Sequence, residues 1–363
     1  MKSINRPSDN SDKNEKDPEA FLREPVFIEQ ETDEDAVLNL SLRPMKFDEF
    51  IGQDKLKDNL KIGIEAAKSR NEPLDHLIFS GPPGLGKTTL AHIIAHEMGT
   101  KITTTSGPAI ERAGDLIGVL TNLEHGDILF IDEIHRLSNI VEEFLYPAME
   151  DYKIDFVIDK GPYAKTIKFN LKPFTLIGAT TRSGLLTSAL RSRFGMHYHL
   201  DFYPWEELVK IVEKSAGRLS MDMDQESAVI IAKRSRGTPR VANRLLRRVR
   251  DYSQVKAGGV ISADITNAAL DLQGIDAQGL DDIDRRVLKV VMDTYDGGPV
   301  GIESLSATLN EESDTIVDVV EPYLLKIGFL KRTPRGRQVT EAAYAHMNKQ
   351  PKKNTQKELF GDE

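Results

Sequence analysis

The chain has 363 residues, 39% of them hydrophobic and 29% charged, which is enough for two or three folded domains. It contains no cysteine, so disulfides, thiolate nucleophiles and thiolate metal sites are excluded and a reducing compartment is expected. The formal net charge is −9, but residues 1–36 hold eleven acidic and five basic side chains, so the acidic total does not exclude a nucleic-acid partner.

The polar, acidic composition of residues 1–36 predicts a disordered extension. This segment lacks the apolar stretch of a signal peptide, and no apolar run in the sequence approaches the roughly 18 residues of a membrane span. We therefore expect a cytoplasmic protein. The composition of residues 350–363 predicts a second disordered tail.

Residues 37–202 alternate short apolar runs with helical patterns, which predicts an α/β domain with a parallel sheet and helices on both faces. The predicted strands are His76–Ser80, Lys101–Thr104, Ile128–Ile131 and Thr175–Ala179. The predicted helices are Lys87–Met98, Ile110–Leu120 and Asn139–Glu150. Two further runs, Lys153–Ile158 and Lys165–Phe169, are joined across the turn residues 159–162 and predict an inserted β-hairpin.

Residues 203–274 are helical throughout and predict a small helical domain. Its expected helices are Pro204–Ser215, Asp224–Arg234, Pro239–Gln254 and Ser262–Leu272, the last of them capped by Ser262. Residues 275–349 predict helices at Asp281–Tyr295, Ile302–Leu309 and Ser313–Lys326, followed by two strands around Pro334 and Gly336. Three helices closed by a two-stranded wing are typical of a winged helix-turn-helix.

Residues 81–88 read Gly-Pro-Pro-Gly-Leu-Gly-Lys-Thr and match the phosphate-binding loop G-x-x-x-x-G-K-[ST], between a predicted strand and a predicted helix. The glycines allow backbone N–H groups to close around phosphate oxygens, and the helix N-terminus adds partial positive charge. Lys87 is expected to reach the β and γ phosphates, and Thr88 to place its hydroxyl on Mg²⁺.

Asp132 and Glu133 directly follow the predicted apolar strand Ile128–Ile131. Asp132 suits a water-mediated Mg²⁺ position, and Glu133 suits the base that polarises an attacking water, so the pair indicates hydrolysis rather than binding alone. Thr181 follows a neighbouring strand, where its hydroxyl would face the γ-phosphate. Arg240 lies in the first turn of a predicted helix, which is unfavourable unless an anion lies opposite. Arg193 follows a short helix and, on its own, is equally well a solvated arginine.

In this order the motifs resemble an AAA+ ATPase: phosphate loop, Asp-Glu strand, polar sensor, Arg-x-Arg-Phe at 191–194 and Gly-Thr-Pro-Arg at 237–240. With Ser41–Pro44, Phe50–Gln53, Ile177–Arg182 and Arg332–Arg337 added, the sequence from about residue 40 to 347 resembles the RuvB family of bacterial Holliday-junction branch-migration motors. The resemblance implies an ATP-hydrolysing hexameric ring on duplex DNA, in recombination, DNA repair and the SOS response, working with RuvA and the resolvase RuvC.

The resemblance also implies roles for single residues. The implied nucleotide-binding residues are Leu42, Arg43, Gly84, Gly86, Lys87, Thr88, Thr89, Tyr203 and Arg240. Arg193 is implied to be an arginine finger that reaches the nucleotide of the adjacent subunit, with Glu150, Asp151 and Tyr152 at the same interface. The loop Asp159–Ala164 corresponds to the element that docks RuvA, although Tyr163 and Lys165 replace an expected Ala and Arg.

Lys331, Arg332, Arg335 and Arg337 lie within seven residues that contain no acid, around a Pro-Arg-Gly turn. Such a tip can lay guanidinium groups along DNA phosphates, although a short basic run is more often only solvated. The resemblance favours DNA contact by Arg332, Arg335 and Arg337. Ser313 stands where the family usually has another DNA-contacting arginine.

Two other classes remain open at this point: another AAA+ DNA machine, such as a clamp loader or initiator, and a nucleotide-gated DNA-binding regulator. The terminal winged helix and the missing cysteine disfavour a clamp loader, and no initiator-type insertions are evident. The Asp132–Glu133 pair disfavours a regulator that does not hydrolyse ATP. In the tail, Gln356–Phe360 loosely resembles a peptide that binds sliding clamps, with a chance match as the alternative.

Overall fold

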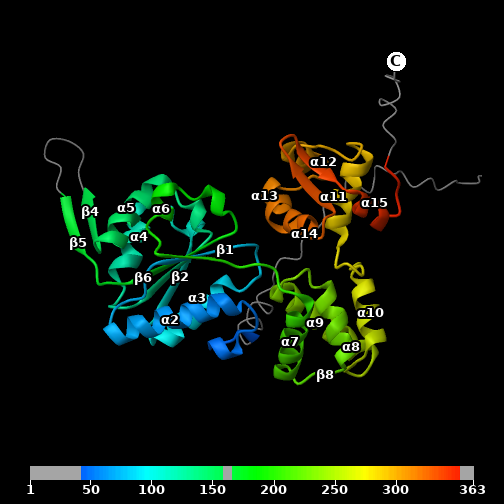
Figure 1. Ribbon diagram of the computed structural model, residues 1–363, viewed down its shortest axis with the longest axis horizontal. Helices are drawn as coiled ribbons and strands as arrows, with labels where there is room; N and C mark the ends of the chain where they lie inside the picture. The colour runs from blue at the N-terminus through cyan, green and yellow to red at the C-terminus, as the bar shows by residue number, and fades with distance from the viewer. Residues whose placement is uncertain (1–41, 158–165, 352–363) are drawn as a thin grey trace, which may run out of the picture. The chain divides into compact units, whose positions relative to one another are not determined.

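The computed structural model describes residues 42–157 and 166–351 (Figure 1). The chain divides into two compact units, one ending at Asp281 and the other beginning at Asp282, and each is described by itself. Three predicted features lie outside the described residues: the acidic extension of residues 1–36, the loop Asp159–Ala164 and the segment Gln356–Phe360.

The first unit contains a five-stranded parallel sheet with the strand order β2-β3-β6-β1-β7. Its strands are β1 Leu77–Ser80, β2 Ile102–Ser106, β3 Ile128–Asp132, β6 Thr175–Thr180 and β7 Met196–His199. The central strand β6 is buried along its whole length, which explains its continuous apolar run. The predicted parallel sheet is confirmed. Strand β7 was not predicted, because its Met-His-Tyr-His sequence alternates half-buried and exposed residues at a sheet edge.

Helices cover both faces of this sheet, as expected (Figure 1). They are α2 Asp54–Arg70, α3 Lys87–Met98, α4 Ala113–Thr121, α5 Asn139–Glu150 and α6 Ser188–Arg191. Alternate residues of each strand face opposite cores: Phe79 and Phe130 pack in the core that contains α2 and α3, whereas Ile78 and Leu129 pack in the core that contains α4 and α5. Short 3₁₀ turns occur at Phe47–Glu49, Gly107–Ala109, Ile134–Arg136 and Ser183–Leu185.

The predicted β-hairpin is present as β4 Lys153–Val157 and β5 Thr166–Asn170, which pair antiparallel with Lys153 opposite Asn170. It projects from the end of α5, away from the main sheet (Figure 1). The helical part of the same unit consists of α7 Trp205–Arg218, α8 Gln225–Arg234, α9 Pro239–Lys256 and α10 Ala263–Leu272, with the short parallel pair β8 Asp222–Met223 and β9 Val260–Ile261. Ser262 caps α10 as predicted, accepting from the N–H of Ile265 at 3.5 Å.

The second unit is a winged helix. Its elements are α11 Asp282–Asp293, α12 Ile302–Leu309, α13 Ser313–Thr315, η6 Ile316–Val320, α14 Glu321–Lys326, β10 Leu330–Thr333, β11 Gly336–Val339 and α15 Glu341–His346. Strands β10 and β11 are antiparallel, with Arg332 opposite Arg337. The predicted helix Ser313–Lys326 is interrupted by the π-helical turn η6. Pro322 explains this widening, since its ring would clash with the carbonyl four residues earlier and it has no N–H to donate.

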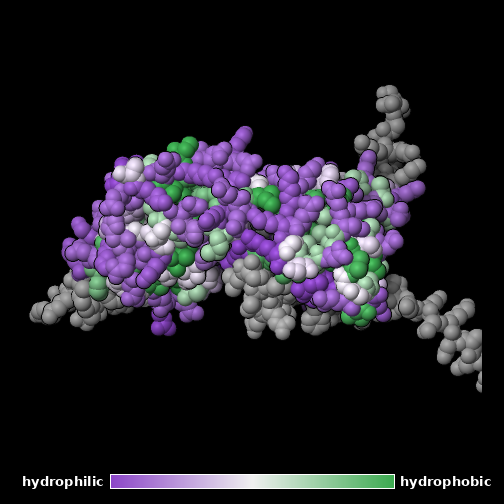
Figure 2. All heavy atoms as spheres, turned by 90° about the horizontal axis from the view of Figure 1, so that it is seen from below, coloured by the Kyte–Doolittle hydropathy of each residue, from purple (hydrophilic) through white to green (hydrophobic). Residues whose placement is uncertain are grey.

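The face shown in Figure 2 is largely hydrophilic, and its hydrophobic side chains lie in small separate groups. Isolated exposed apolar residues are ordinary on folded proteins. Among residues 42–157 and 166–351, no helix is both long enough and apolar enough to cross a bilayer.

Candidate active site

A cavity of about 350 Å³ lies in the first unit between the phosphate-loop domain and the helical domain. Nine of the predicted nucleotide-binding residues line it: Leu42, Arg43, Gly84, Gly86, Lys87, Thr88, Thr89, Tyr203 and Arg240. The acidic pair Asp132 and Glu133 lines the same cavity. The structure therefore gathers, in one space, residues from five separate parts of the sequence.

The phosphate loop needs its glycines for two reasons. Gly84 and Gly86 have φ values of 81° and 99°, in the left-handed region that side chains disfavour. At Gly81 a Cβ atom would lie 2.3 Å from the carbonyl oxygen of Leu200, so the backbones are too close for any side chain. These constraints shape a loop whose N–H groups can face an anion at the start of α3.

Lys87 begins α3 and is 93% buried, an unusual position for an ammonium group. Its Nζ donates hydrogen bonds to the carbonyl oxygens of Gly81 at 2.8 Å and Pro82 at 2.9 Å. The ammonium group is thus bound to the phosphate loop. Lys87 also lines the cavity, so a phosphate group bound there would lie next to it.

Glu133 lies at the carboxyl end of β3 in a left-handed conformation, with a φ of 47°. Its Oε2 accepts a hydrogen bond from Thr181 Oγ1 at 3.2 Å and lies 3.3 Å from Nδ1 of His135. The His135 ring is almost completely buried and is also within 2.8 Å of Thr180 Oγ1. Left-handed backbone at a non-glycine residue costs about 1–3 kcal/mol and is concentrated at functional sites.

Thr181 therefore contacts the predicted base, a contact that the sequence did not predict, and it does not line the cavity itself. His135 was missed. The signal for it was present in the sequence, since it follows the Asp-Glu pair by two residues, but only the fold shows that its ring turns back to Glu133.

The helical domain closes on the phosphate loop through two residues. The N–H of Arg240, in the first turn of α9, donates to the carbonyl of Gly84 at 3.3 Å. The Tyr203 hydroxyl donates to the carbonyl of Leu85 at 3.4 Å. Burial raises the pKa of Tyr203, so its hydroxyl remains a protonated donor. The phosphate loop is therefore in direct contact with the helical domain.

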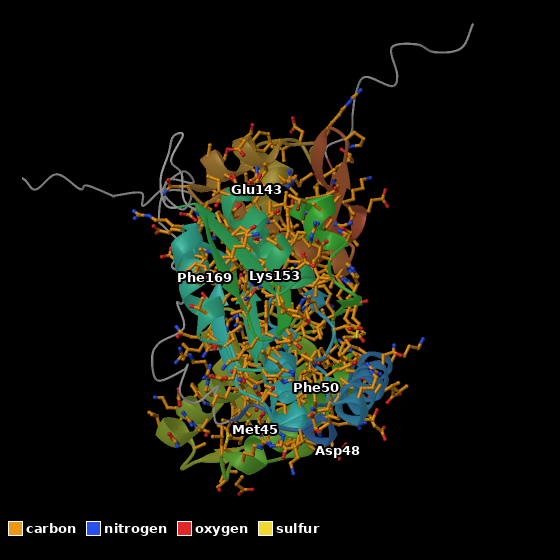
Figure 3. All side chains as sticks on the ribbon, turned by 90° about the vertical axis from the view of Figure 1, so that its left-hand side faces the viewer. Met45, Asp48, Phe50, Glu143, Lys153 and Phe169 are labelled. Atoms are coloured by element: carbon orange, nitrogen blue, oxygen red, sulfur yellow. The ribbon has the colours of Figure 1, made fainter. Side chains whose placement is uncertain are left out.

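A second group of predicted residues lies outside the cavity. Arg193 Nε is 3.1 Å from Glu150 Oε1, but the N–H does not point at that oxygen, so the contact is an ion pair without a hydrogen bond. Arg193 Nη1 donates to the carbonyl of Ala189 at 2.7 Å. Phe50 lines the cavity, and Figure 3 shows Glu143 of α5 and Lys153 of β4 well separated from it.

The structure thus brings Arg193 and Glu150 together and leaves both away from the cavity of their own chain. Asp151 is exposed at the C-terminus of α5. Tyr152 is half-buried, and its ring packs against His76 and Phe174 with centroids 6.4 and 5.9 Å apart. That packing indicates a supporting role for Tyr152 in this chain.

The arginines of the basic wing, residues 331–337, contact an acidic residue that lies outside this stretch of sequence. Glu321, the first residue of α14, is completely buried and accepts hydrogen bonds from both Arg332 and Arg337. The Arg332 side chain is 52% exposed, whereas that of Arg337 is 16% exposed. Arg335 is exposed at the tip. Ser313 begins α13, with its hydroxyl 2.9 Å from that of Ser306.

Replacing Glu321 with glutamine is expected to destabilise the winged helix by about 3 kcal/mol, because breaking a buried ion pair leaves charge uncompensated. Faster amide hydrogen exchange in β10 and β11 of the full chain would report the loss. Glu341→Gln, on the exposed first turn of α15, is the matched control and should change stability by less than about 1 kcal/mol. Equal exchange in the two variants would contradict the anchoring role of Glu321.

The fold and the cavity define an AAA+ P-loop ATPase with a helical lid and a winged-helix domain. Family models describe the same three parts: the Holliday junction DNA helicase RuvB P-loop domain matches residues 42–200, the RuvB AAA lid domain 203–276, and the RuvB C-terminal winged helix domain 277–348. The chain belongs to the RuvB family, the ATP-driven motors of Holliday junction branch migration.

Solved structures agree with this assignment. The Thermotoga maritima RuvB Holliday junction branch migration motor is 51% identical, covers 85% of this chain and 99% of its own, and superposes with a TM-score of 0.79. A point mutant of that protein is 52% identical with the same coverage and a TM-score of 0.80. The family assignment supports the branch-migration interpretation over the clamp-loader, initiator and regulator alternatives.

Proposed function

We propose that this chain drives branch migration of Holliday junctions by hydrolysing ATP in the cavity between the phosphate-loop domain and the lid. The observation that carries the proposal is that the phosphate loop, the Asp132–Glu133 pair and the lid residue Arg240 line one space. A triphosphate in that space would contact both parts of the unit. Cleavage and phosphate release would then alter how α9 rests on the loop, which supplies the movement that a motor needs.

The residues of the cavity have distinct proposed roles. Lys87 and the N–H groups of the loop hold the phosphates, and Arg240 reports their presence to the lid. Thr88 and Asp132 hold Mg²⁺, an ion that prefers oxygen ligands and keeps several of its waters, so a hydroxyl and a carboxylate suit it. When bound, Mg²⁺ would neutralise charge that develops on the phosphate oxygens.

Glu133 is proposed as the group that orients the attacking water. Thr181 holds Oε2 of this carboxylate, and within the described part of the chain Oε1 has no hydrogen-bond partner. Oε1 is therefore the atom proposed to accept a proton from the attacking water. Thr181 fixes the direction of the carboxylate and in this way links the end of β6 to the reaction.

The position of Arg193 supports a ring of identical subunits. Arg193 and Glu150 lie outside their own cavity and are proposed to complete the cavity of a neighbour, in a homohexamer. An arginine supplied from a neighbouring subunit makes hydrolysis depend on assembly. In this proposal Asp151 and Tyr152 belong to the same subunit seam.

We also propose that the chain acts in the cytoplasm, within the SOS response, with RuvA docked on the β4–β5 hairpin and RuvC joining at resolution. The projection of that hairpin from the sheet supports a docking role (Figure 1). Duplex DNA is proposed to meet the wing at Arg332, Arg335 and Arg337. A sliding clamp bound to Gln356–Phe360 is a weaker proposal that rests on the tail sequence alone.

The direct test is dissociation of a labelled four-way DNA junction by the full chain with RuvA. The expected result is dissociation with ATP and none with a non-hydrolysable analogue, since binding alone does no work. A nicked linear duplex of the same sequence is the substrate control. ATP turnover without any junction dissociation would contradict the proposed function.

Replacing Arg332 with alanine is expected to weaken duplex binding about uniformly across sequences and to reduce the slope of log K against log salt by about 1, because one phosphate contact is lost. Glu321 keeps Arg337 as a partner in this variant, so the wing should stay folded. Fluorescence anisotropy over a salt series measures both quantities. An unchanged affinity and slope would show that Arg332 does not contact DNA.

A further inference from the structure

One face of α5 carries Glu142, Tyr146 and Glu150, which are spaced four residues apart and therefore lie on successive turns. Arg193 packs on this face. Its Cζ atom lies 4.2 Å from the centre of the Tyr146 ring, and its Nε lies 3.1 Å from Glu150. The guanidinium group is thus placed by an aromatic platform on one side and a carboxylate at its edge.

The Tyr146 ring is itself held in place by a hydrogen bond to Glu142. Glu142 is almost completely buried, and its Oε2 accepts hydrogen bonds from the Tyr146 hydroxyl and from Thr187 Oγ1, both at 2.8 Å. Thr187 is also the N-cap of α6, accepting from the N–H of Leu190 at 3.2 Å. One buried carboxylate therefore sets both the tilt of the Tyr146 ring and the start of the helix that leads to Arg193.

The contacts of Arg193 differ in how strictly they orient it. The pairing with Glu150 is one of charge, and Nε has no hydrogen-bond acceptor among the described residues. A charge contact leaves the plane of a guanidinium free to turn, whereas stacking on a ring fixes that plane. Nη1 is tied at one point by its hydrogen bond to the carbonyl of Ala189. The Tyr146 ring is the contact that fixes the plane of the guanidinium group.

We propose that Tyr146 is a positioning residue for Arg193, holding its guanidinium preset at the surface where a neighbouring subunit's nucleotide meets it. This rests on the proposed role of Arg193 in a subunit seam. Without the ring, the arginine samples other rotamers and must be ordered again at each hydrolysis event. Tyr146 itself does not reach the nucleotide, and its loss leaves the cavity of its own subunit intact.

The variant pair Tyr146→Leu and Tyr146→Phe separates the ring from the hydroxyl. Tyr146→Leu is expected to lower kcat for ATP by about 10–100-fold, the size of effect that misplacing a catalytic group produces. Tyr146→Phe keeps the aromatic face and is expected to stay within about threefold of the original chain. ATP affinity and ring assembly should be unchanged in both. If Tyr146→Leu does not fold, Tyr146→Met fills the same space without a ring.

Mixed rings then distinguish positioning from general damage. Tyr146→Leu subunits keep an intact cavity, and Glu133→Gln subunits keep an intact Arg193. Mixing these two impaired preparations is expected to raise ATP turnover above that of either alone, at seams where a Glu133→Gln subunit supplies the arginine to a Tyr146→Leu subunit. Arg193→Ala mixed with Glu133→Gln is the reference for the seam itself.

The outcomes are separable. Recovery in both mixtures supports the positioning role. Recovery with Arg193→Ala but not with Tyr146→Leu overturns it and leaves the subunit seam in place. No recovery in either mixture overturns the seam, and with it the proposed function of Arg193. Unchanged turnover in Tyr146→Leu alone also overturns the inference.

Discussion

Replacing Arg193 with alanine is expected to lower ATP turnover by about 10³–10⁵-fold, the contribution of an arginine that stabilises charge in phosphoryl transfer. ATP binding should change little, because Arg193 does not line the cavity of its own chain. Steady-state turnover and the Kd of a fluorescent ATP analogue measure the two effects separately.

The control for this variant is Arg191→Ala. Arg191 lies two residues away, is exposed, and donates to the carbonyl of Ser183 rather than to α5. Its replacement should leave turnover within about threefold, as for a surface arginine. Equal losses in the two variants, or turnover above about a tenth of the original for Arg193→Ala, would contradict the finger role.

Replacing Lys87 with alanine is expected to weaken ATP binding by about 10²-fold or more, since each hydrogen bond to a charged group contributes about 1.5–3 kcal/mol. Junction dissociation should be lost with it. Lys214→Ala is the matched control: Lys214 lines the same cavity, but its Nζ donates to the carbonyl of Glu49. Titration of both variants with ATP gives the comparison, and equal affinities would show that the cavity is not the triphosphate site.

The helices Lys87–Met98 and Asn139–Glu150 agree with the sequence prediction to the residue. Both have clear starts, since α3 follows the glycines of the phosphate loop and Ser138 caps α5. Helix α2 and strand β7 were not predicted. Strand β7 lies at the sheet edge, where one side of the strand is exposed and the apolar pattern is weak.

The nucleotide cavity could be predicted because its residues belong to short sequence motifs. The carboxyl ends of parallel strands also lie at one edge of a sheet, which brings these motifs together. Contacts between distant segments could not be predicted. No acid lies among residues 331–337, yet Glu321 accepts from two of their arginines because α14 packs against β10. The contact of Tyr146 with Arg193 likewise joins α5 to a segment far along the chain.

ATP is proposed to be cleaved at a seam between two copies of this chain. Turnover per subunit across a dilution series, with mass photometry on the same samples, tests this proposal. Turnover per subunit is expected to fall with the fraction of subunits in rings and to disappear in the monomer. A monomer that hydrolyses ATP at the full rate would contradict it.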